Sequence, residues 1–347
     1  DISRPVVMLQ HGILNSSAAW VVAGPKYSLA LKLADAGYDV WLGNNRGTHF
    51  GRKHNRFTIT DPQFWNWSFQ HMGLDDLPSQ IDYVLNYTKQ EKLTYIGHSQ
   101  GTTQAFVGFS SLPNLQDKVN LFIGLAPVTS LRNQRNHALR FLAKLKSEAI
   151  FKWFGMGELG HRSVSSSLLP GIASSFKYSL MSKMNGLWSL VMDCNLDTEC
   201  LSLLTQLEPS PTSITNMAHW AYLVRSGRFC KRDLGKTLNE QFYGPKGIPE
   251  EFPLEKIRIP VALIYGTMDL LSTPEDVEGF LKPKLQNVVY SKKCENFKHN
   301  DFIWSKSADE MHQEVIALMS RYSKSEESHS KELLDSTKDT EAEGIMK

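Results

Sequence analysis

The sequence of 347 residues predicts an α/β fold: a mostly parallel sheet with an inserted, largely helical segment. Short apolar runs rich in β-forming residues alternate with stretches whose apolar residues recur at helical spacing. This alternation favours parallel strands joined by right-handed crossovers. It stops between about residues 128 and 257 and then resumes. We therefore expect a core of residues 1–127 and 258–322, a cap or lid formed by residues 128–257, and a charged tail at 323–347 that is disordered.

The first half of the chain contains four apolar runs that predict buried strands. These strands are expected at Pro5–Gln10, Tyr38–Leu42, Leu93–Ile96 and Val119–Pro127. Helical spacing predicts helices at Pro25–Ala36, at about Asp75–Tyr87 and from Thr102 onward. The aromatic cluster of Phe64, Trp65, Trp67 and Phe69 is expected to pack in the core rather than stack on a ligand.

The second half begins with the irregular insert and ends with resumed alternation. The insert contains an amphipathic helix at Asn136–Phe154, whose apolar face packs on the domain or touches a lipid surface. That face carries Phe141, Leu142, Leu145 and Ala149. After the insert we expect strands at Val261–Tyr265 and Asn287–Tyr290, and helices at Pro274–Leu281 and Ala308–Tyr322.

A G-x-S-x-G pentapeptide, Gly97 to Gly101, falls between a predicted strand and a predicted helix. In this context the motif is typical of a nucleophile elbow, in which a sharp turn exposes the serine hydroxyl at the carboxyl edge of the sheet. The flanking glycines relieve crowding at such a turn. Ser99 is therefore the candidate nucleophile. The adjacent His98 is expected to be structural, because neighbouring side chains at an elbow point elsewhere.

A serine nucleophile needs a histidine base and a carboxylate that orients the histidine. When the serine lies in a nucleophile elbow, the acid and then the histidine follow it in the chain. His299 lies in a loop just after a predicted strand, whereas the two later histidines fall in the last helix and the tail. Asp269 directly follows the strand Val261–Tyr265, and Glu275 and Asp276 instead begin a helix. Asp269 and His299 are the predicted partners of Ser99.

The oxyanion of an acyl-transfer reaction needs two backbone donors. One is expected from the N–H of Gln100, directly after the nucleophile. The other is expected from Ile13, because His11-Gly12 follows the first strand and a glycine permits a tight turn that leaves the next N–H free.

Composition excludes several other classes of protein. A net charge of +2 without a dense basic run gives no reason to expect a nucleic-acid partner, and no apolar stretch is long enough to span a bilayer. The four cysteines lack the spacing of a metal site, so no metal is expected, and a serine, histidine and aspartate mechanism requires no cofactor. Cys194 and Cys200 could form a disulfide or be two buried thiols.

Other features bear on the setting of the protein. Asn15, Asn66 and Asn86 begin sequons for N-glycosylation. Because the chain begins at Asp1, almost directly on a strand, we expect that a signal peptide or membrane anchor preceded it.

Several stretches together resemble the acid lipase family of α/β-hydrolases, which includes gastric and lysosomal lipases and steryl ester hydrolases. They are PVVMLQHG, SSAAW, LADAGYDVWLGNNRGT, MGLDDLPSQIDYVL, GHSQGTTQAF, LAPV, SITNMAHW and HNDFIW. The resemblance places the nucleophile on Ser99, the acid on Asp269, the base on His299 and the oxyanion donors on Ile13 and Gln100. It implies a secreted or lysosomal enzyme, with a lipid-droplet or membrane-associated one as the alternative.

Taken together, the sequence predicts a serine hydrolase that cleaves lipid carboxylic esters through an acyl-enzyme. Triacylglycerols and steryl esters are the two substrate classes, met at a membrane, micelle or lipid-droplet surface. An acyltransferase with the same three residues, or a catalytically silent lipid-binding homologue, is the alternative. The substrate preference, the pH optimum and the oligomeric state do not follow from the sequence.

Overall fold

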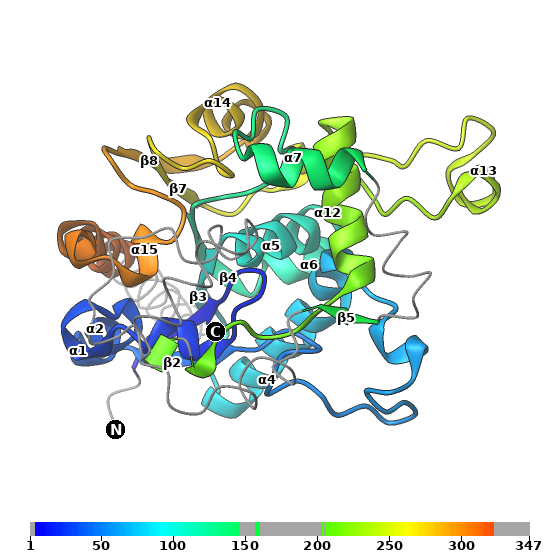
Figure 1. The fold of residues 1–347 in the computed structure, drawn as a ribbon. Coiled ribbons are helices and arrows are strands. Elements are labelled where there is room, and N and C mark those ends of the chain that lie inside the picture. The colour runs from blue at the N-terminus through cyan, green and yellow to red at the C-terminus, as the bar shows by residue number, and fades with distance from the viewer. Residues whose placement is uncertain (1–3, 146–156, 160–202, 205, 323–347) are drawn as a thin grey trace, which may run out of the picture.

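The computed structural model describes residues 4–145, 157–159, 203–204 and 206–322 (Figure 1). Its centre is a six-stranded sheet in which each neighbouring pair of strands is parallel, with the order β2-β1-β3-β4-β7-β8. The strands are β1 (Val6–Gln10), β2 (Asp39–Gly43), β3 (Leu93–His98), β4 (Val119–Leu125), β7 (Val261–Gly266) and β8 (Val288–Cys294). The predicted parallel sheet is therefore confirmed.

Side chains of the strands alternate between two hydrophobic cores, one on each face of the sheet. In β1, Val6 and Met8 point into one core, while Val7 and Leu9 point into the other. Helices α4 (Leu77–Thr88) and α5 (Gln100–Ser111) cover the first face, and α2 (Leu29–Asp35) and the helix at 309–322 cover the second. The strands are rich in apolar residues because both faces of the sheet are buried.

The remaining helices lie around this framework. They are α1 (Gly24–Tyr27), α3 (Phe69–His71), α6 (Pro113–Gln116), α7 (His137–Lys144), α12 (Ile214–Ser226), α13 (Lys236–Tyr243), α14 (Pro274–Asp276) and α15 (Asp301–Trp304). The four aromatic residues between Phe64 and Phe69 are buried in the first core, as predicted. No helix in the described ranges is long and apolar enough to cross a membrane.

Several element boundaries differ from the predicted ones. Ser28 has an extended backbone (φ −82°, ψ 120°), which divides the predicted helix Pro25–Ala36 into α1 and α2. The predicted helix at Pro274–Leu281 is α14 followed by a π-helical turn. β8 continues to Cys294 through polar residues, because it is an edge strand whose side chains are partly exposed.

The chain between β4 and β7 contributes α7, α12, α13 and a small antiparallel sheet of β5 (Glu158–Leu159) and β6 (Thr212–Ser213). Ser213 caps α12 by accepting a hydrogen bond from the N–H of Asn216, and Gly227 ends the helix in a left-handed conformation (φ 62°). In Figure 1 the helices α7 and α12 lie together above α5. The inserted segment therefore adjoins the helix that follows the elbow.

The predicted helix at Asn136–Phe154 is described only as far as Leu145. Asn136 caps α7 through its side chain, and Ala143 is buried. Phe141 and Leu145 are 61% and 54% exposed, so of the two expected roles of this face, contact with a lipid surface is the one that remains a prediction for these two side chains. Ala149, the Cys194–Cys200 pair and the charged tail at 323–347 lie outside the described residues.

Candidate active site

Ser99 occupies a strained turn between β3 and α5. Its backbone angles are φ 53° and ψ −119°, a region that residues with a side chain rarely adopt. A Cβ added at Gly101 would lie 2.3 Å from the backbone oxygen of Gln10, and one added at Gly97 would lie 2.7 Å from backbone atoms of Gly101. The two glycines of the motif are thus required because backbones approach one another closely at the elbow.

The structure brings together the three residues predicted for catalysis. Nε2 of His299 lies 2.7 Å from Oγ of Ser99. Nδ1 of His299 lies 2.8 Å from Oδ2 of Asp269. These side chains follow β3, β7 and β8, and parallel strands end at the same edge of the sheet, so one sheet edge supplies all three. All three are buried, with exposed fractions of 0% to 8%.

Asp269 is held as a carboxylate by several donors. Its Oδ1 accepts hydrogen bonds from the backbone N–H groups of Leu271 (2.8 Å) and Ser272 (2.9 Å). Burial alone would raise the pKa of Asp269. The imidazole of His299 and the two backbone donors outweigh that effect, so the pKa lies below its ordinary value. The charged carboxylate fixes the His299 tautomer that keeps Nε2 free to accept a proton.

The competing candidates have other partners. Asp276 accepts hydrogen bonds from Asn133 and Ser130, and Glu275 forms an exposed ion pair with Arg135. His312 is buried, with its Nε2 2.9 Å from the carbonyl oxygen of Phe302. None of these three side chains takes part in the Ser99–His299–Asp269 arrangement.

The loop that precedes Ile13 is fixed by a buried histidine. Nε2 of His11 accepts a 3.1 Å hydrogen bond from the N–H of Asn45, so Nδ1 carries the proton and donates to the carbonyl of Gly12 at 2.8 Å. Burial lowers the pKa of His11 to about 4, which keeps the ring neutral. A Cβ at Gly12 would lie 3.0 Å from Cβ of Ser99, so this turn packs directly on Ser99.

His98 lines the active-site pocket as well as supporting it. Its Nε2 donates a 2.8 Å hydrogen bond to the carbonyl oxygen of His299, and the two rings lie 5.3 Å apart. Burial lowers the pKa of His98 to about 3. The ring is therefore neutral, and it anchors the loop that carries His299.

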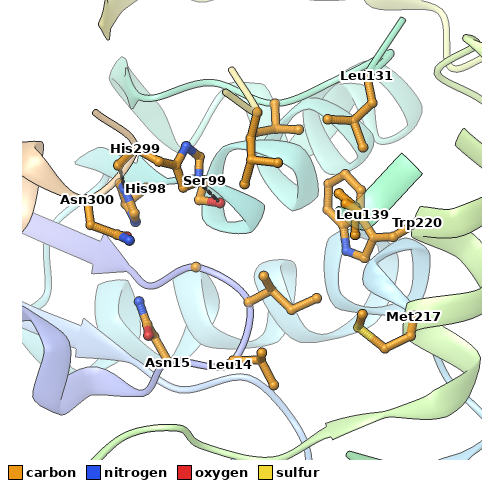
Figure 2. A pocket seen from close by; sticks show the side chains of 14 residues that line it. Leu14, Asn15, His98, Ser99, Leu131, Leu139, Met217, Trp220, His299 and Asn300 are labelled. Atoms are coloured by element: carbon orange, nitrogen blue, oxygen red, sulfur yellow. Dashed lines mark hydrogen bonds between the residues drawn. The ribbon is translucent and has the colours of Figure 1, made fainter. Parts of the chain in front are cut away.

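The pocket at Ser99 is predominantly apolar (Figure 2). Its apolar lining includes Leu14, Val128, Leu131, Leu139, Met217 and Trp220. Because Leu139 belongs to α7 and Met217 and Trp220 belong to α12, the inserted segment forms one wall. Such a wall can accommodate a hydrocarbon chain.

The insert also holds the residue after the nucleophile, a relationship that the sequence did not indicate. Oε1 of Gln100 accepts hydrogen bonds from Nδ2 of Asn216 (2.7 Å) and Nε1 of Trp220 (2.8 Å). Asn216 also accepts from the N–H of Phe69 through its Oδ1 at 2.7 Å. The four-residue spacing of Asn216 and Trp220 on one helical face is the only sequence signal for this site.

The three sequons differ in accessibility. Asn66 and Asn86 are exposed, whereas Asn15 is 3% exposed and lines the pocket. A glycan requires a solvent-exposed side chain, so the prediction of a glycan at Asn15 is wrong for the folded protein. No cluster of three metal-ligating side chains occurs among the described residues.

The fold and this arrangement define the class of protein. Residues 5–306 match the sequence model of the alpha/beta hydrolase fold. A soluble variant of monoglyceride lipase from Saccharomyces cerevisiae superimposes with a TM-score of 0.55 at 15% identity, covering 92% of this chain and 87% of that one. A monoacylglycerol lipase from Paleococcus ferrophilus gives 0.53 at 16% identity, covering 92% and 96%. The protein is an α/β hydrolase.

Sequence comparison then identifies the family. The gastric triacylglycerol lipases of Bos taurus and Homo sapiens are 37% and 36% identical to this chain, covering 91% of it and 80% of each relative. Lipase member M of Homo sapiens is 33% identical over 91% of this chain and 75% of its own length. The chain belongs to the acid lipase family of α/β-hydrolases, as its motifs predict.

Proposed function

We propose that the protein hydrolyses carboxylic esters of lipids through an acyl-enzyme on Ser99. The observation that carries this proposal is the chain of short contacts from Ser99 through His299 to Asp269 at the floor of an apolar pocket. Oγ of Ser99 attacks the ester carbonyl while Nε2 of His299 takes its proton. Asp269 stabilises the imidazolium that forms.

Collapse of the tetrahedral intermediate completes the first half of the reaction. The backbone N–H groups of Ile13 and Gln100 stabilise its oxyanion. His299 returns the proton to the departing alkoxide, and the alcohol leaves. Water then attacks the acyl-enzyme, with His299 as base, and releases the fatty acid and free Ser99. The position of Gln100 at the first turn of α5 supports its role, because the first N–H groups of a helix have no intrahelical acceptor.

The apolar pocket and the family support the proposed substrate class. Triacylglycerols and steryl esters both carry a long acyl chain, which can pack against the pocket wall formed by α7 and α12. Relatives named gastric triacylglycerol lipases support the former. These substrates are insoluble in water and are met at the surface of membranes, micelles or droplets, so the enzyme acts at a lipid surface.

An active-site probe and an ester panel test the proposal. A fluorophosphonate probe should label the protein, and the label should be lost in Ser99→Ala. The panel runs from short p-nitrophenyl esters to triolein and cholesteryl oleate at pH 5 and pH 7.5. A properly folded wild-type protein that is neither labelled nor active on any ester would overturn the proposed function.

We infer a secreted or lysosomal setting from the family, with a lipid-droplet or membrane surface as the alternative. The exposed sequons at Asn66 and Asn86 support the first setting. The mass of protein made in a secreting eukaryotic cell should fall on treatment with an N-glycosidase. Protein from Asn66→Gln/Asn86→Gln should show no such change.

A further inference from the structure

Three aromatic side chains meet on the surface at one edge of the sheet. Trp41 belongs to the edge strand β2, and Tyr83 and Tyr87 belong to helix α4. The ring of Trp41 lies edge-on to those of Tyr83 and Tyr87, with ring centroids 6.1 Å and 5.3 Å apart. The two tyrosine rings are stacked, with centroids 6.3 Å apart. We call these three residues the Trp41 cluster.

The Trp41 cluster has a partly buried base and an exposed surface. Trp41 is partly buried and packs against the first core. Tyr83 and Tyr87 are 63% and 69% exposed, so most of both rings faces solvent. Single apolar side chains on a surface need no explanation, but adjoining aromatic rings mark a contact site. Because the rings hold one another in place, an occupant does not have to order them.

Asn86 begins a sequon directly beside this cluster. Asn86 is exposed and lies on α4 between Tyr83 and Tyr87 in sequence. With about 3.6 residues per turn, Asn86 and Tyr87 flank Tyr83 on its two sides around the helix. Residues three apart on a helix are neighbours, with Cβ atoms about 5–6 Å apart. A sugar attached to Asn86 therefore meets the ring of Tyr83 first.

The first sugar of an N-linked glycan has the chemistry that an exposed aromatic ring binds. The substituents of N-acetylglucosamine lie around the rim of its ring, so its two faces present C–H groups. The face of an aromatic ring carries partial negative charge and attracts these polarised C–H groups. A protein or lipid would have to be captured from solution, whereas a glycan on Asn86 is held beside the cluster at high effective concentration.

The Trp41 cluster lies away from the catalytic edge of the sheet. Helix α4 ends at Thr88 and β3 begins at Leu93, so this end of the helix lies at the amino edge of the sheet. Ser99 follows the carboxyl end of β3. Figure 1 shows α4 near the lower margin of the molecule and α7, which forms part of the pocket wall, near the upper margin. A glycan on Asn86 therefore leaves the pocket open.

We propose that Asn86 carries an N-linked glycan whose first N-acetylglucosamine packs on Tyr83 and covers the Trp41 cluster. The inference rests on the secreted or lysosomal setting proposed above and is independent of the hydrolytic reaction. The glycan shields exposed rings beside an edge strand, the part of a sheet that most readily pairs with another chain. It also stabilises the packing of α4 on β2.

Hydroxyl-radical footprinting tests the contact on protein made in a secreting eukaryotic cell. Peptide mapping should first find a glycan on Asn86. Tyr83 should then be oxidised about twofold more slowly in the wild type than in Asn86→Gln, because a sugar on one face of the ring leaves the other face open. Phe242 on α13 is also 63% exposed and should be oxidised equally in both proteins.

A double-mutant cycle separates packing on the ring from a nearby glycan that only crowds it. Asn86→Gln should lower the Tm of the glycosylated protein by about 1–3 °C, the shift expected for one aromatic contact. In a Tyr83→Ala background the same change should have no effect on Tm. In a Phe242→Ala background, which removes an equally exposed ring from α13, it should lower Tm as in the wild type.

The outcomes distinguish this inference from the proposals above. A glycan on Asn66 without one on Asn86 would overturn this inference alone, and a protein without either glycan would also remove the support for secretion. Equal oxidation of Tyr83 in the two proteins, or the same loss of Tm with and without the tyrosine ring, would overturn the packing and leave the cluster open to another partner. Asn86→Gln should hydrolyse p-nitrophenyl butyrate at the wild-type rate, so a wild type that lacks fluorophosphonate labelling and activity would instead overturn the proposed reaction.

Discussion

Nε1 of Trp220 donates a 2.8 Å hydrogen bond to Oε1 of Gln100, the residue that follows the nucleophile. Asn216 donates to the same oxygen, and Nε2 of Gln100 lies 3.4 Å from Sδ of Met72. The side chain of Gln100 is therefore held by helix α12 of the inserted segment. Its backbone N–H is a proposed oxyanion donor, so the insert positions a catalytic group as well as forming a wall of the pocket.

Replacing Trp220 by Phe removes this hydrogen bond and keeps an aromatic ring in the pocket wall. We expect kcat on a soluble p-nitrophenyl ester to fall about three- to tenfold, with a smaller change in KM. Tyr222→Phe, on the same helix, is the matched control and should retain wild-type kcat. Full kcat in Trp220→Phe would show that the indole N–H does not position Gln100.

Asp269→Asn tests the carboxylate that orients the base. The amide keeps the shape of the side chain but favours the wrong histidine tautomer, so kcat should fall on the order of 10³- to 10⁴-fold. Glu275→Gln neutralises a nearby exposed carboxylate that pairs with Arg135 and should change kcat less than about twofold. Retention of a large part of the activity in Asp269→Asn would exclude Asp269 from the assigned role.

Gly101→Ala tests the close packing at the elbow. The new Cβ would lie 2.3 Å from the carbonyl oxygen of Gln10, a backbone atom that cannot move alone. We expect a loss of about 3 kcal/mol in the free energy of unfolding, measured by denaturant titration. A Cβ at Gly279 meets nothing within 4 Å, so Gly279→Ala should be neutral or slightly stabilising. Equal stability of the two variants would contradict the packing described.

The buried histidines predict a loss of stability in acid. Burial lowers the pKa of His11 and His312 to about 4 and that of His98 and His219 to about 3, from an ordinary value of 6.5. As the pH falls below 6.5 the unfolded chain binds protons that the folded chain does not. The free energy of unfolding therefore falls between about pH 6.5 and pH 4, by up to about 1.4 kcal/mol per pH unit for each histidine.

Urea unfolding at several pH values measures this effect. His312→Gln should make the dependence less steep by about 1.4 kcal/mol per pH unit within that window. His137→Gln removes an exposed histidine from α7 and should leave the slope as in the wild type. A pH-independent wild type over this range would show that the buried histidines accept protons in the folded state.

The main sheet and the positions of Ser99, Asp269 and His299 could be predicted because short apolar runs in the sequence mark the strands of the sheet. The inner strands β1, β3, β4 and β7 are buried on both faces, and each of the three residues directly follows a strand or lies in the loop beyond it. Since parallel strands end at one edge, chain order alone brings the three residues close together. The family motifs agree with these positions.

Other parts of the site depend on contacts between distant segments. The sequon at Asn15 suggests a surface site, but hydrogen bonds from Ser210 and to Glu208 draw its loop into the core. The pattern of apolar residues in the insert does not predict that the side chain of Trp220 contacts that of Gln100. The π-helical turns at Met72–Asp76 and Val277–Leu281 and the break at Ser28 also arise from tertiary packing, which weak local propensities do not determine.

Trapping the acyl-enzyme tests the central claim most directly. Wild-type protein mixed with excess p-nitrophenyl butyrate and quenched in acid within milliseconds should gain the mass of one butyryl group, and peptide mapping should place that group on Ser99. The burst of p-nitrophenol should approach one equivalent per chain, and Ser99→Ala should show neither signal. Acylation of another residue, or turnover by Ser99→Ala at the wild-type rate, would contradict the account.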